Sequence, residues 1–311
     1  MNTQTWFVNA IVEAKTKYSP KELLEVGFDS YYGQYHIFSD WTKANQLYDY
    51  VKENMERYWF IFCKDELLLQ QGEGGYNIPL SESAPVTLQP WHTQIELPTM
   101  NGKSCVALRM DAPITYLSDM KMVGLRVSFE VLTEDEYRMA GKAAELLYWD
   151  STTKFCGVCG GPMKFHTAIS KRCVNCGKEV WPQLSTAIIV LVKRGDEALM
   201  VHAHNFRGKH YGLVAGFVET GETLEECVAR EVWEETHIRV CNIRYYGSQP
   251  WPYPCGLMVG FVADYAGGAL KLQHEELEAG GWFSRSNLPE IPGKVSLARR
   301  LIDAWLEREF D

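Results

Sequence analysis

The sequence has no long apolar run, no excess of positive charge and no recognisable leader. Its longest apolar stretches, such as residues 187–192, are far shorter than the ~20 residues that a membrane-spanning helix needs. The 31 basic and 40 acidic residues give a net charge of −9, which argues against a broad surface for duplex DNA. The N-terminal stretch MNTQTWFVNAIVEAK lacks a basic segment followed by an apolar one. We therefore expect no secretion signal, no membrane partner and a cytoplasmic location.

The chain also lacks an even number of cysteines, because it has nine. Five are scattered, and the other four form two CxxC pairs, Cys156 with Cys159 and Cys173 with Cys176. This distribution favours a reducing compartment with metal-bound thiolates over a disulfide framework. A glycine follows each pair, as suits a tight turn, and four thiolates at this spacing predict a closed, structural Zn²⁺ site. The alternative is four free or redox-active thiols.

The patterning of the chain predicts an α+β protein. Strands and helices are mixed without a regular βαβ repeat, which favours an α/β sandwich over a doubly wound sheet in the C-terminal part. Thr133 and Glu136 form a capping box that would open a helix. The expected segments are an N-terminal α+β domain at 1–132, a linking helix at 133–150, a zinc ribbon at 151–183 and a C-terminal α/β domain at 184–311.

Local periodicity and turn residues predict the individual elements. We interpret the ten aromatic residues between positions 31 and 60 as core. The expected turns are at 101–102 and 194–196, and the expected helices, besides the linking helix, are at about 41–58, from Thr223 onward, and at about 295–307. The expected strands are at 58–63, 66–70, 93–97, 104–110, 186–193, 197–203, 211–218, 243–247 and 257–265.

One stretch, GFVETGETLEECVAREVWEETHI at residues 216–238, contains seven glutamates and a single arginine. Like charges three and four residues apart on a helix repel each other, so this run does not stabilise the helix by itself. Glu231, Glu234 and Glu235 lie on one helix face and would raise one another's pKa unless a cation bound there. Oxygen ligands of this kind suit Mg²⁺ or Mn²⁺. The alternative is a solvated acidic face, and the triplet alone does not favour either interpretation.

The complete pattern resembles the Nudix box, Gly-x5-Glu-x7-Arg-Glu-(apolar)-x-Glu-Glu-x-Gly-(apolar). It matches from Gly216 through Glu222 and Arg230 to Glu235, and it departs at the last glycine, which is His237 here. Nudix enzymes use divalent metals to hydrolyse a nucleoside diphosphate linked to another moiety. We expect Arg230 to pair with Glu222 or with a helix carboxylate. We interpret His237 as a left-handed C-cap, in preference to a catalytic or sensing histidine.

A second signature, SQPWPYPCG at residues 248–256, begins ten residues after the box. Its three prolines predict a rigid, locally extended loop on which Trp251 and Tyr253 offer stacking faces for a base. The alternative is a loop that packs its own aromatic rings. The segment resembles the SQPWPFPxS signature of the NADH pyrophosphatases, with Tyr253 in place of Phe and Gly256 in place of Ser. The zinc ribbon and its opening FCGVCG match the layout of that family, and the resemblance covers about residues 147–300.

The resemblance to the NADH pyrophosphatases implies a reaction, in which NAD(H) and water give NMN(H) and AMP. Some members of that family also remove NAD caps from RNA 5′ ends. The family is homodimeric, with a nucleotide pocket shared between subunits, so a homodimer is implied here. The implied catalytic groups are Glu231, Glu234 and Glu235. The implied Mg²⁺ or Mn²⁺ ligands are Glu231, Glu235 and Glu276, with Glu275 as an adjacent candidate.

Other residues are implied to contact the nucleotide. Trp181 stands where the family has Tyr, a change that preserves stacking. On the residues alone, Phe217 and Ala298 would be interpreted as core. The implied nucleotide-binding residues are Trp181, Phe217, Gln249, Pro250, Trp251, Pro252, Tyr253, Pro254, Cys255, Gly256 and Ala298.

Two alternative functions stay open on the sequence. One is a Nudix hydrolase of another dinucleotide or of ADP-ribose, because the hydroxyl lost at Gly256 could relax recognition of a phosphate or ribose. The other is a non-catalytic nucleotide sensor, for which His237 would be the evidence. Retention of every carboxylate of the box argues against the sensor.

Overall fold

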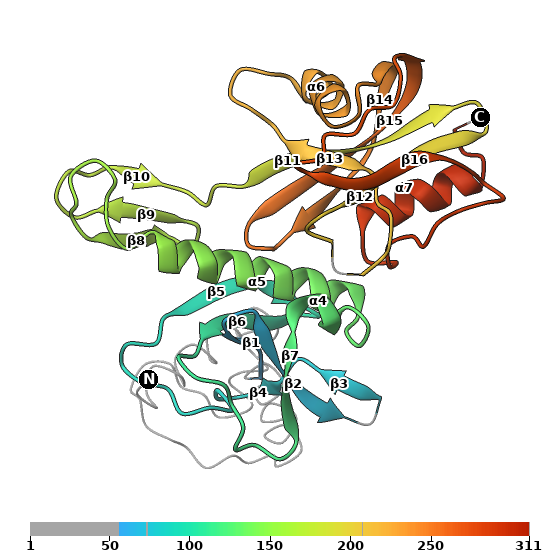
Figure 1. The fold of residues 1–311 in the computed structure, drawn as a ribbon. Helices are drawn as coiled ribbons and strands as arrows, with labels where there is room; N and C mark the ends of the chain where they lie inside the picture. Colours follow the sequence, from blue (N-terminus) through green and yellow to red (C-terminus); the bar gives the residue numbers. More distant parts are fainter. Residues whose placement is uncertain (1–55, 73, 207, 311) are drawn as a thin grey trace, which may run out of the picture. The chain divides into compact units, whose positions relative to one another are not determined.

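The structure is a computed structural model that describes residues 56–72, 74–206 and 208–310 (Figure 1). The chain divides into two compact units, Met1–Glu136 and Tyr137–Asp311. Across the described residues, no helix is long and apolar enough to cross a membrane.

A seven-stranded sheet makes up the described part of the first unit. Its strand order is β3-β2-β1-β6-β5, with β4 beside β1 and β7 beside β2. A short helix, α4 (Leu125–Ser128), follows the last strand. The strands are β1 Arg57–Cys63, β2 Glu66–Gly72, β3 Gly75–Asn77, β4 Leu80–Ser81, β5 Gln94–Met100, β6 Lys103–Arg109 and β7 Met120–Gly124.

Most predictions for this unit are confirmed. The four predicted strands correspond to β1, β2, β5 and β6. Asn101 and Gly102 both have positive φ, 52° and 74°, as the tight hairpin turn between β5 and β6 requires. Of the ten aromatic residues predicted to be core, Trp59 and Phe60 are buried and Tyr58 is partly buried, whereas the other seven lie outside the described residues. The helix predicted at 41–58 lies outside the described residues up to position 55, and its C-terminal end is wrong because Arg57 begins β1.

Helix α5 (Glu134–Thr152) leads from the first unit into the second. The predicted capping box is confirmed, because the Glu136 carboxylate accepts the Thr133 N–H at 3.0 Å and Thr133 Oγ1 accepts the Glu136 N–H at 3.4 Å. The helix continues past the predicted end at residue 150, as far as Thr152. A three-stranded ribbon follows, in the order β10-β9-β8, with β8 Met163–Thr167, β9 Ser170–Cys173 and β10 Glu179–Val180.

A buried lysine fixes the ribbon to the C-terminal end of α5. Lys171, on β9, is 2% exposed, and its Nζ lies 2.7 Å from Asp150 Oδ1. The same ammonium donates to the carbonyl oxygens of Asp150 and Thr153, each at 2.9 Å. Burial lowers the pKa of Lys171, while the charge of Asp150 opposes that shift. Because a helix C-terminus attracts cations, the partners of Lys171 compensate for the loss of its hydration.

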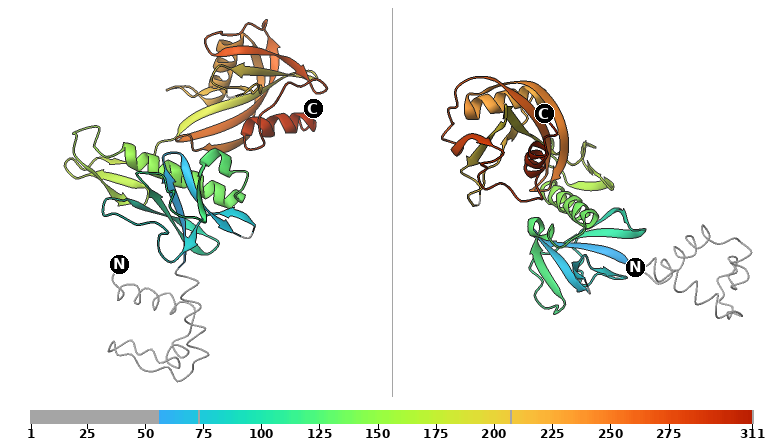
Figure 2. Two further views of the ribbon diagram at one scale, coloured as in Figure 1. Left: turned by 60° about the horizontal axis from the view of Figure 1, so that its bottom comes forward. Right: turned by 90° about the vertical axis from the view of Figure 1, so that its right-hand side faces the viewer.

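The second sheet has the strand order β14-β15-β11-β12-β16, with β13 beside β11. Side chains of β11 alternate between its faces. Ile188 and Val190 pack with α6 (Leu224–Thr236), whereas Ile189 and Leu191 pack with α7 (Leu297–Leu306). The two helices therefore cover opposite faces, which confirms the predicted α/β/α sandwich (Figure 1, Figure 2). The strands are β11 Ser185–Arg194, β12 Glu197–Ala203, β13 Val214–Phe217, β14 Arg239–Trp251, β15 Gly256–Gly267 and β16 Leu277–Ser284.

In the second sheet, the predicted strands are at the correct positions in the sequence, but several differ in length from the observed strands. Residues 211–218 contribute only the four residues of β13, whereas β14 and β15 are much longer than predicted. Gln249, Pro250 and Trp251 therefore belong to β14, and the predicted loop shrinks to residues 252–255. The closing helix is confirmed, with Ser296 as its N-cap.

Six of the seven strands in the sheet of the first unit correspond in topology to the six strands of the second sheet, and β3 has no counterpart. In each unit, a central strand (β1 or β11) has an antiparallel hairpin partner (β2 or β12) and a parallel partner (β6 or β15). Further antiparallel strands correspond in the same way, β5 to β14, β7 to β16 and β4 to β13. The units differ after β4 and β13, because the described residues 82–93 of the first unit form no helix equivalent to α6.

Candidate active site

Strand β13 and helix α6 bring Gly216 and Glu231 into direct contact. A Cβ placed on Gly216 would lie 1.9 Å from the carboxyl carbon of Glu231 and 2.0 and 2.2 Å from its oxygens. Gly216 also pairs with Ile188 of β11, so the strand cannot withdraw without breaking the sheet. The first glycine of the acidic motif is therefore required because only a residue without a side chain lets the carboxylate rest on the backbone.

The loop between β13 and α6 is closed by hydrogen bonds that the motif itself supplies. Gly221 has φ +97°, a conformation that side chains rarely adopt. The Glu222 carboxylate accepts the Glu219 N–H at 2.7 Å. Thr223 then forms a capping box with Glu226, which satisfies the first N–H groups of α6. The direction in which α6 leaves the loop is therefore fixed locally.

Arg230 holds the carboxylates in place, as expected from the sequence. It is bidentate to Glu222, with Nη2–Oε1 at 2.6 Å and Nε–Oε2 at 3.0 Å. Its Nη1 reaches Glu231 at 2.9 Å and Glu234 at 3.1 Å, and its Nη2 donates to the Phe217 carbonyl at 3.0 Å. The pKa of Glu222 is lowered to about 2, and the hydrogen bond from Arg230 is the largest cause of this shift. The guanidinium thus links the loop, the strand and two helix carboxylates.

Glu235 is the most deeply buried carboxylate of the group, at 4% exposure. Burial raises its pKa to about 8, and the charges of Glu231, Glu276 and Glu234 add to the shift. Burial also raises the pKa of Glu231, against the opposing effect of Arg230. Carboxylates that destabilise one another's ionised form in this way gain most from a bound cation.

Glu276 belongs to a segment, between β15 and β16, that is hydrogen-bonded to the end of α6. The Gln273 N–H donates to the Glu235 carbonyl at 2.9 Å, and the Glu276 N–H donates to the Gln273 carbonyl at 3.1 Å. The charge of Glu276 raises the pKa of both Glu231 and Glu235. Glu231, Glu235 and Glu276 thus offer oxygen donors of the type that Mg²⁺ or Mn²⁺ prefers. Their oxygens are not gathered within 4.8 Å of one another in the described structure, as the sulfurs of the ribbon cysteines are.

The residues implied to bind nucleotide are in unlike environments. Trp181 follows β10 in the ribbon, is 51% exposed and makes no ring contact with any described residue. Phe217, at the end of β13, is 65% exposed, so its interpretation as a core residue is wrong. Ala298 is buried against Leu297 and Ile302 in the core beneath α7, which confirms the core interpretation for that residue.

Residues 249–256 form the end of the β14–β15 hairpin. Gln249 uses both ends of its side-chain amide, donating to the Val295 carbonyl and accepting the Leu297 N–H, each at 2.7 Å. The rings of Trp251 and Tyr253 are half-buried and pack edge to face at 5.2 Å, as the self-packing alternative expected.

The other members of this segment shape the hairpin. Pro252 is buried, whereas Pro250 and Pro254 are exposed. The Cys255 carbonyl accepts the Ser185 N–H at 2.8 Å. A Cβ on Gly256 would lie 3.0 Å from the Trp251 carbonyl oxygen, so a larger residue there would press on the backbone of Trp251.

The four cysteines of the ribbon converge. Cys156 and Cys176 have their sulfurs 3.6 Å apart, Cys159 and Cys173 have theirs 3.4 Å apart, and all four sulfurs lie within 4.8 Å of one another. Sulfurs bound at 2.3 Å around one tetrahedral Zn²⁺ are about 3.8 Å apart, so the cluster fits zinc. Backbone N–H groups of Val158 and Asn175 also point at Cys156 and Cys173, each at 3.4 Å.

His237 caps α6 in the left-handed conformation, with φ 57° and ψ 23°, which confirms the structural interpretation. Its N–H donates to the Trp233 carbonyl at 2.8 Å, and its ring packs on the Trp233 ring at 5.1 Å. Among the described residues, no acidic side chain forms an ion pair with His237. A histidine thus replaces the usual glycine because ring packing offsets the cost of positive φ.

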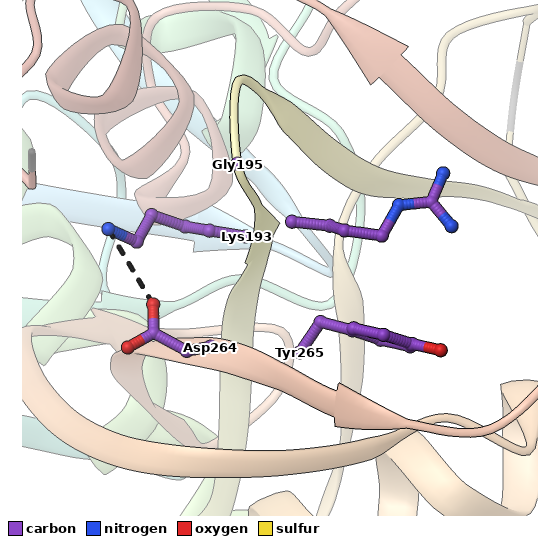
Figure 3. Close-up of a pocket in the computed structure, with 5 residues that line it drawn as sticks. Lys193, Gly195, Asp264 and Tyr265 are labelled. Carbon is purple, nitrogen blue, oxygen red and sulfur yellow. Dashed lines mark ion pairs between the residues drawn. The ribbon is translucent and has the colours of Figure 1, made fainter.

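A cavity of about 340 Å³ is separate from this chemistry (Figure 3). It is lined by Lys193, Arg194, Gly195, Asp264 and Tyr265, at the end of β11. Lys193 already pairs with Asp264 at 3.6 Å and contacts the Phe310 carbonyl, while Arg194 stacks over Trp282 at 4.2 Å. The acidic cluster meets β11 near its start, at Ile188, so the cavity does not contribute to that site.

Two segments of the chain match known domain families. Residues 182–305 match the family described as NUDIX domain, and residues 56–149 match the one described as NADH pyrophosphatase-like rudimentary NUDIX domain. The acidic site therefore lies in a Nudix hydrolase domain.

Two relatives that match most of the chain identify the family within this class. A protein of Stutzerimonas stutzeri named NAD-capped RNA hydrolase NudC is 38% identical over 242 residues, covering 74% of this chain and 87% of that protein. A protein of the same name from Pseudomonas aeruginosa is 40% identical over 228 residues, covering 70% and 81%. The chain belongs to this NudC family of Nudix hydrolases. A solved NUDIX hydrolase from Nitrosomonas europaea is 25% identical and covers 50% of this chain and 92% of its own, with a TM-score of 0.44.

Replacement of Gly216 by alanine tests the contact with Glu231. We expect the Kd for Mn²⁺, measured by calorimetry, to rise about 10- to 100-fold, because the new Cβ displaces a metal ligand. Gly247→Ala is the matched control, since a Cβ there has no neighbouring atom within 4 Å. A Gly216→Ala protein with a native circular dichroism spectrum and unchanged Mn²⁺ affinity would contradict the assignment.

The thiolate cluster predicts about one Zn²⁺ per purified chain, measured by elemental analysis. Cys173→Ser should lose the metal and lower the thermal stability, because zinc binding and folding of a ribbon are coupled. Cys241→Ser, which changes an exposed cysteine outside the cluster, should keep both. Zinc-free wild-type protein with four freely alkylated ribbon thiols would rule out the site.

Proposed function

We propose that the protein hydrolyses the pyrophosphate bond of NAD(H), giving NMN(H) and AMP, and that it also removes NAD caps from RNA 5′ ends. The observation that carries the proposal is the carboxylate cluster of Glu231, Glu235 and Glu276, organised by Arg230 and Gly216. Membership of the NudC family supports the choice of substrate.

The residues of the cluster have distinct tasks in this reaction. When bound, Mg²⁺ or Mn²⁺ would polarise a phosphoryl oxygen and activate a water molecule. Glu231, Glu235 and Glu276 would hold the metal, and Arg230 keeps the Glu231 carboxylate oriented. Glu234 has a side chain that is 51% exposed, so water can reach it, and it is positioned to accept a proton at a carboxylate oxygen.

Aromatic faces would hold the two ends of the dinucleotide. Trp181 and Phe217 are both more than half exposed, and Trp251 and Tyr253 are partly exposed at the end of the hairpin. A base or a nicotinamide ring can stack on such faces, and each stacked base contributes about 1–3 kcal/mol. Gln249 acts differently in this proposal, because it fixes the start of α7 beside β14, and Ala298 packs in the core beneath that helix.

The test is incubation of the protein with NADH and Mn²⁺, followed by mass analysis of the products. Wild type should give NMNH and AMP. Glu235→Gln should lower kcat by about 10²-fold or more, because it removes charge from a metal ligand with almost no change of shape. Glu225→Gln makes the same substitution at an exposed position of the same helix and should be nearly neutral.

Parallel assays with NAD-capped RNA and ADP-ribose separate the remaining substrates. Release of NMN and 5′-monophosphate RNA would support the decapping activity. Faster hydrolysis of ADP-ribose than of NADH would instead favour the alternative substrate class. Full turnover by Glu235→Gln would refute the metal site itself.

The proposal includes a homodimer. The ribbon and the segment after it expose a set of apolar side chains, which suits an interface: Phe155, Val158, Phe165, Ile169, Val174, Trp181 and Leu184. Light scattering should give about twice the chain mass of 35.6 kDa. A fully active protein with the mass of one chain would exclude a shared pocket.

A further inference from the structure

The tip of the β14–β15 hairpin lies beyond the reach of the sheet. The ladder ends at the pair Trp251 and Gly256, so residues 252–255 have no partner strand. Pro252 and Pro254 have no backbone N–H to donate. Within the tip, the Tyr253 N–H donates to the Trp251 carbonyl at 2.7 Å. The Cys255 carbonyl accepts the Ser185 N–H of β11 at 2.8 Å, and side chains attach the tip to a second element.

Helix α5 supplies that attachment at two positions. The hydroxyl oxygens of Tyr137 and Tyr253 are 2.7 Å apart, so one donates a hydrogen bond to the other. One helical turn further, a Cβ on Gly141 would lie 3.1 Å from Pro252 Cγ, and Pro252 is buried. Residues 137 and 141 share a helix face, so α5 contacts two successive residues of the tip.

The contact extends to the neighbouring indole. The Tyr253 ring packs edge to face on Trp251, with ring centroids 5.2 Å apart. A hydrogen bond that fixes the hydroxyl of Tyr253 limits the rotation of its ring, and the packed ring in turn limits Trp251. The sequence signature that this segment resembles has phenylalanine at position 253, so the hydroxyl is a feature of this chain.

Helix α5 can hold the tip of the hairpin in place because its C-terminal end is also fixed. Asp150 and Thr153, at the C-terminal end of α5, accept hydrogen bonds from the buried Lys171. Residues 137 and 150 are separated by about 20 Å along the helix axis. The tip of the hairpin is thus tied to a helix that is anchored in the ribbon.

We propose that the hydroxyl pair of Tyr137 and Tyr253 positions Trp251 for stacking on the nucleotide, which makes Tyr137 a positioning residue of the substrate site. The proposal rests on the proposed function, since it assumes that Trp251 meets a dinucleotide. It adds a requirement for a residue of α5 that lies outside both sequence motifs. Loss of either hydroxyl should loosen the stacking face without touching the carboxylate cluster.

The experiment compares Tyr253→Phe, Tyr137→Phe and the double variant with wild type. Each single variant keeps its ring and should raise KM for NADH about three- to tenfold with kcat unchanged, as expected for loss of one hydrogen bond that fixes a binding face. The double variant should be no worse than either single variant, because both remove the same bond. Tyr265→Phe removes an unrelated 2.7 Å hydroxyl bond to Gly268 and should leave KM unchanged.

A second measurement separates this proposal from the function on which it rests. Calorimetry with NADH and without added Mg²⁺ or Mn²⁺ measures binding without turnover and leaves the zinc in place, and the Kd should rise by the same factor in both single variants. Wild-type protein that binds NADH but does not hydrolyse it would refute the proposed function alone. Unchanged Kd in both variants would refute the positioning role. So would additive losses in the double variant, or a fall in kcat together with a lower melting temperature.

Discussion

The contact between the Glu231 carboxylate and the backbone of Gly216 is the constraint on which the active site depends. It requires β13 to run edge to edge with β11 and α6 to pack across the same face of the sheet. Val228 and Val232 supply the packing, since both are fully buried between α6 and the sheet. Arg230 completes the arrangement by joining Glu222 of the loop to the helix carboxylates. The ion pairs of Arg230, the packing of α6 and the absence of a side chain at Gly216 therefore all position the Glu231 carboxylate.

The first unit has a similar sheet but no equivalent of the contact between Gly216 and Glu231. Six of its seven strands repeat the topology of the second sheet, and the parallel pair β1 and β6 corresponds to β11 and β15. The segment at 82–93 occupies the place of α6 in the sequence but carries a single acidic residue, Glu82, and forms no helix. A sheet of this topology is thus stable without the acidic helix, and the chemistry belongs to the helix and not to the fold.

Local patterns were enough to predict the acidic helix, the capping box that opens α5, the hairpin turn at Asn101-Gly102 and the four converging cysteines. Each depends on residues close together in the sequence or on the fixed geometry of a metal site. The exposure of Phe217 was not predictable, because the face of a short strand depends on how it pairs with β11. The clamp made by Gln249 was missed for a similar reason, since its partners Val295 and Leu297 are more than forty residues away.

Helix α5 gives the ribbon a mechanical connection to the substrate site. A structural zinc site stabilises its own knuckles, and Lys171 of the ribbon transmits that order to Asp150 at one end of the helix. The other end contacts the hairpin through Tyr137 and Gly141. Because a helix of this length bends little, disorder in the ribbon would reach the hairpin as a tilt of α5. Loss of zinc should then weaken nucleotide binding more than it weakens the carboxylate cluster, whose supports at Gly216 and Arg230 lie wholly within the sandwich.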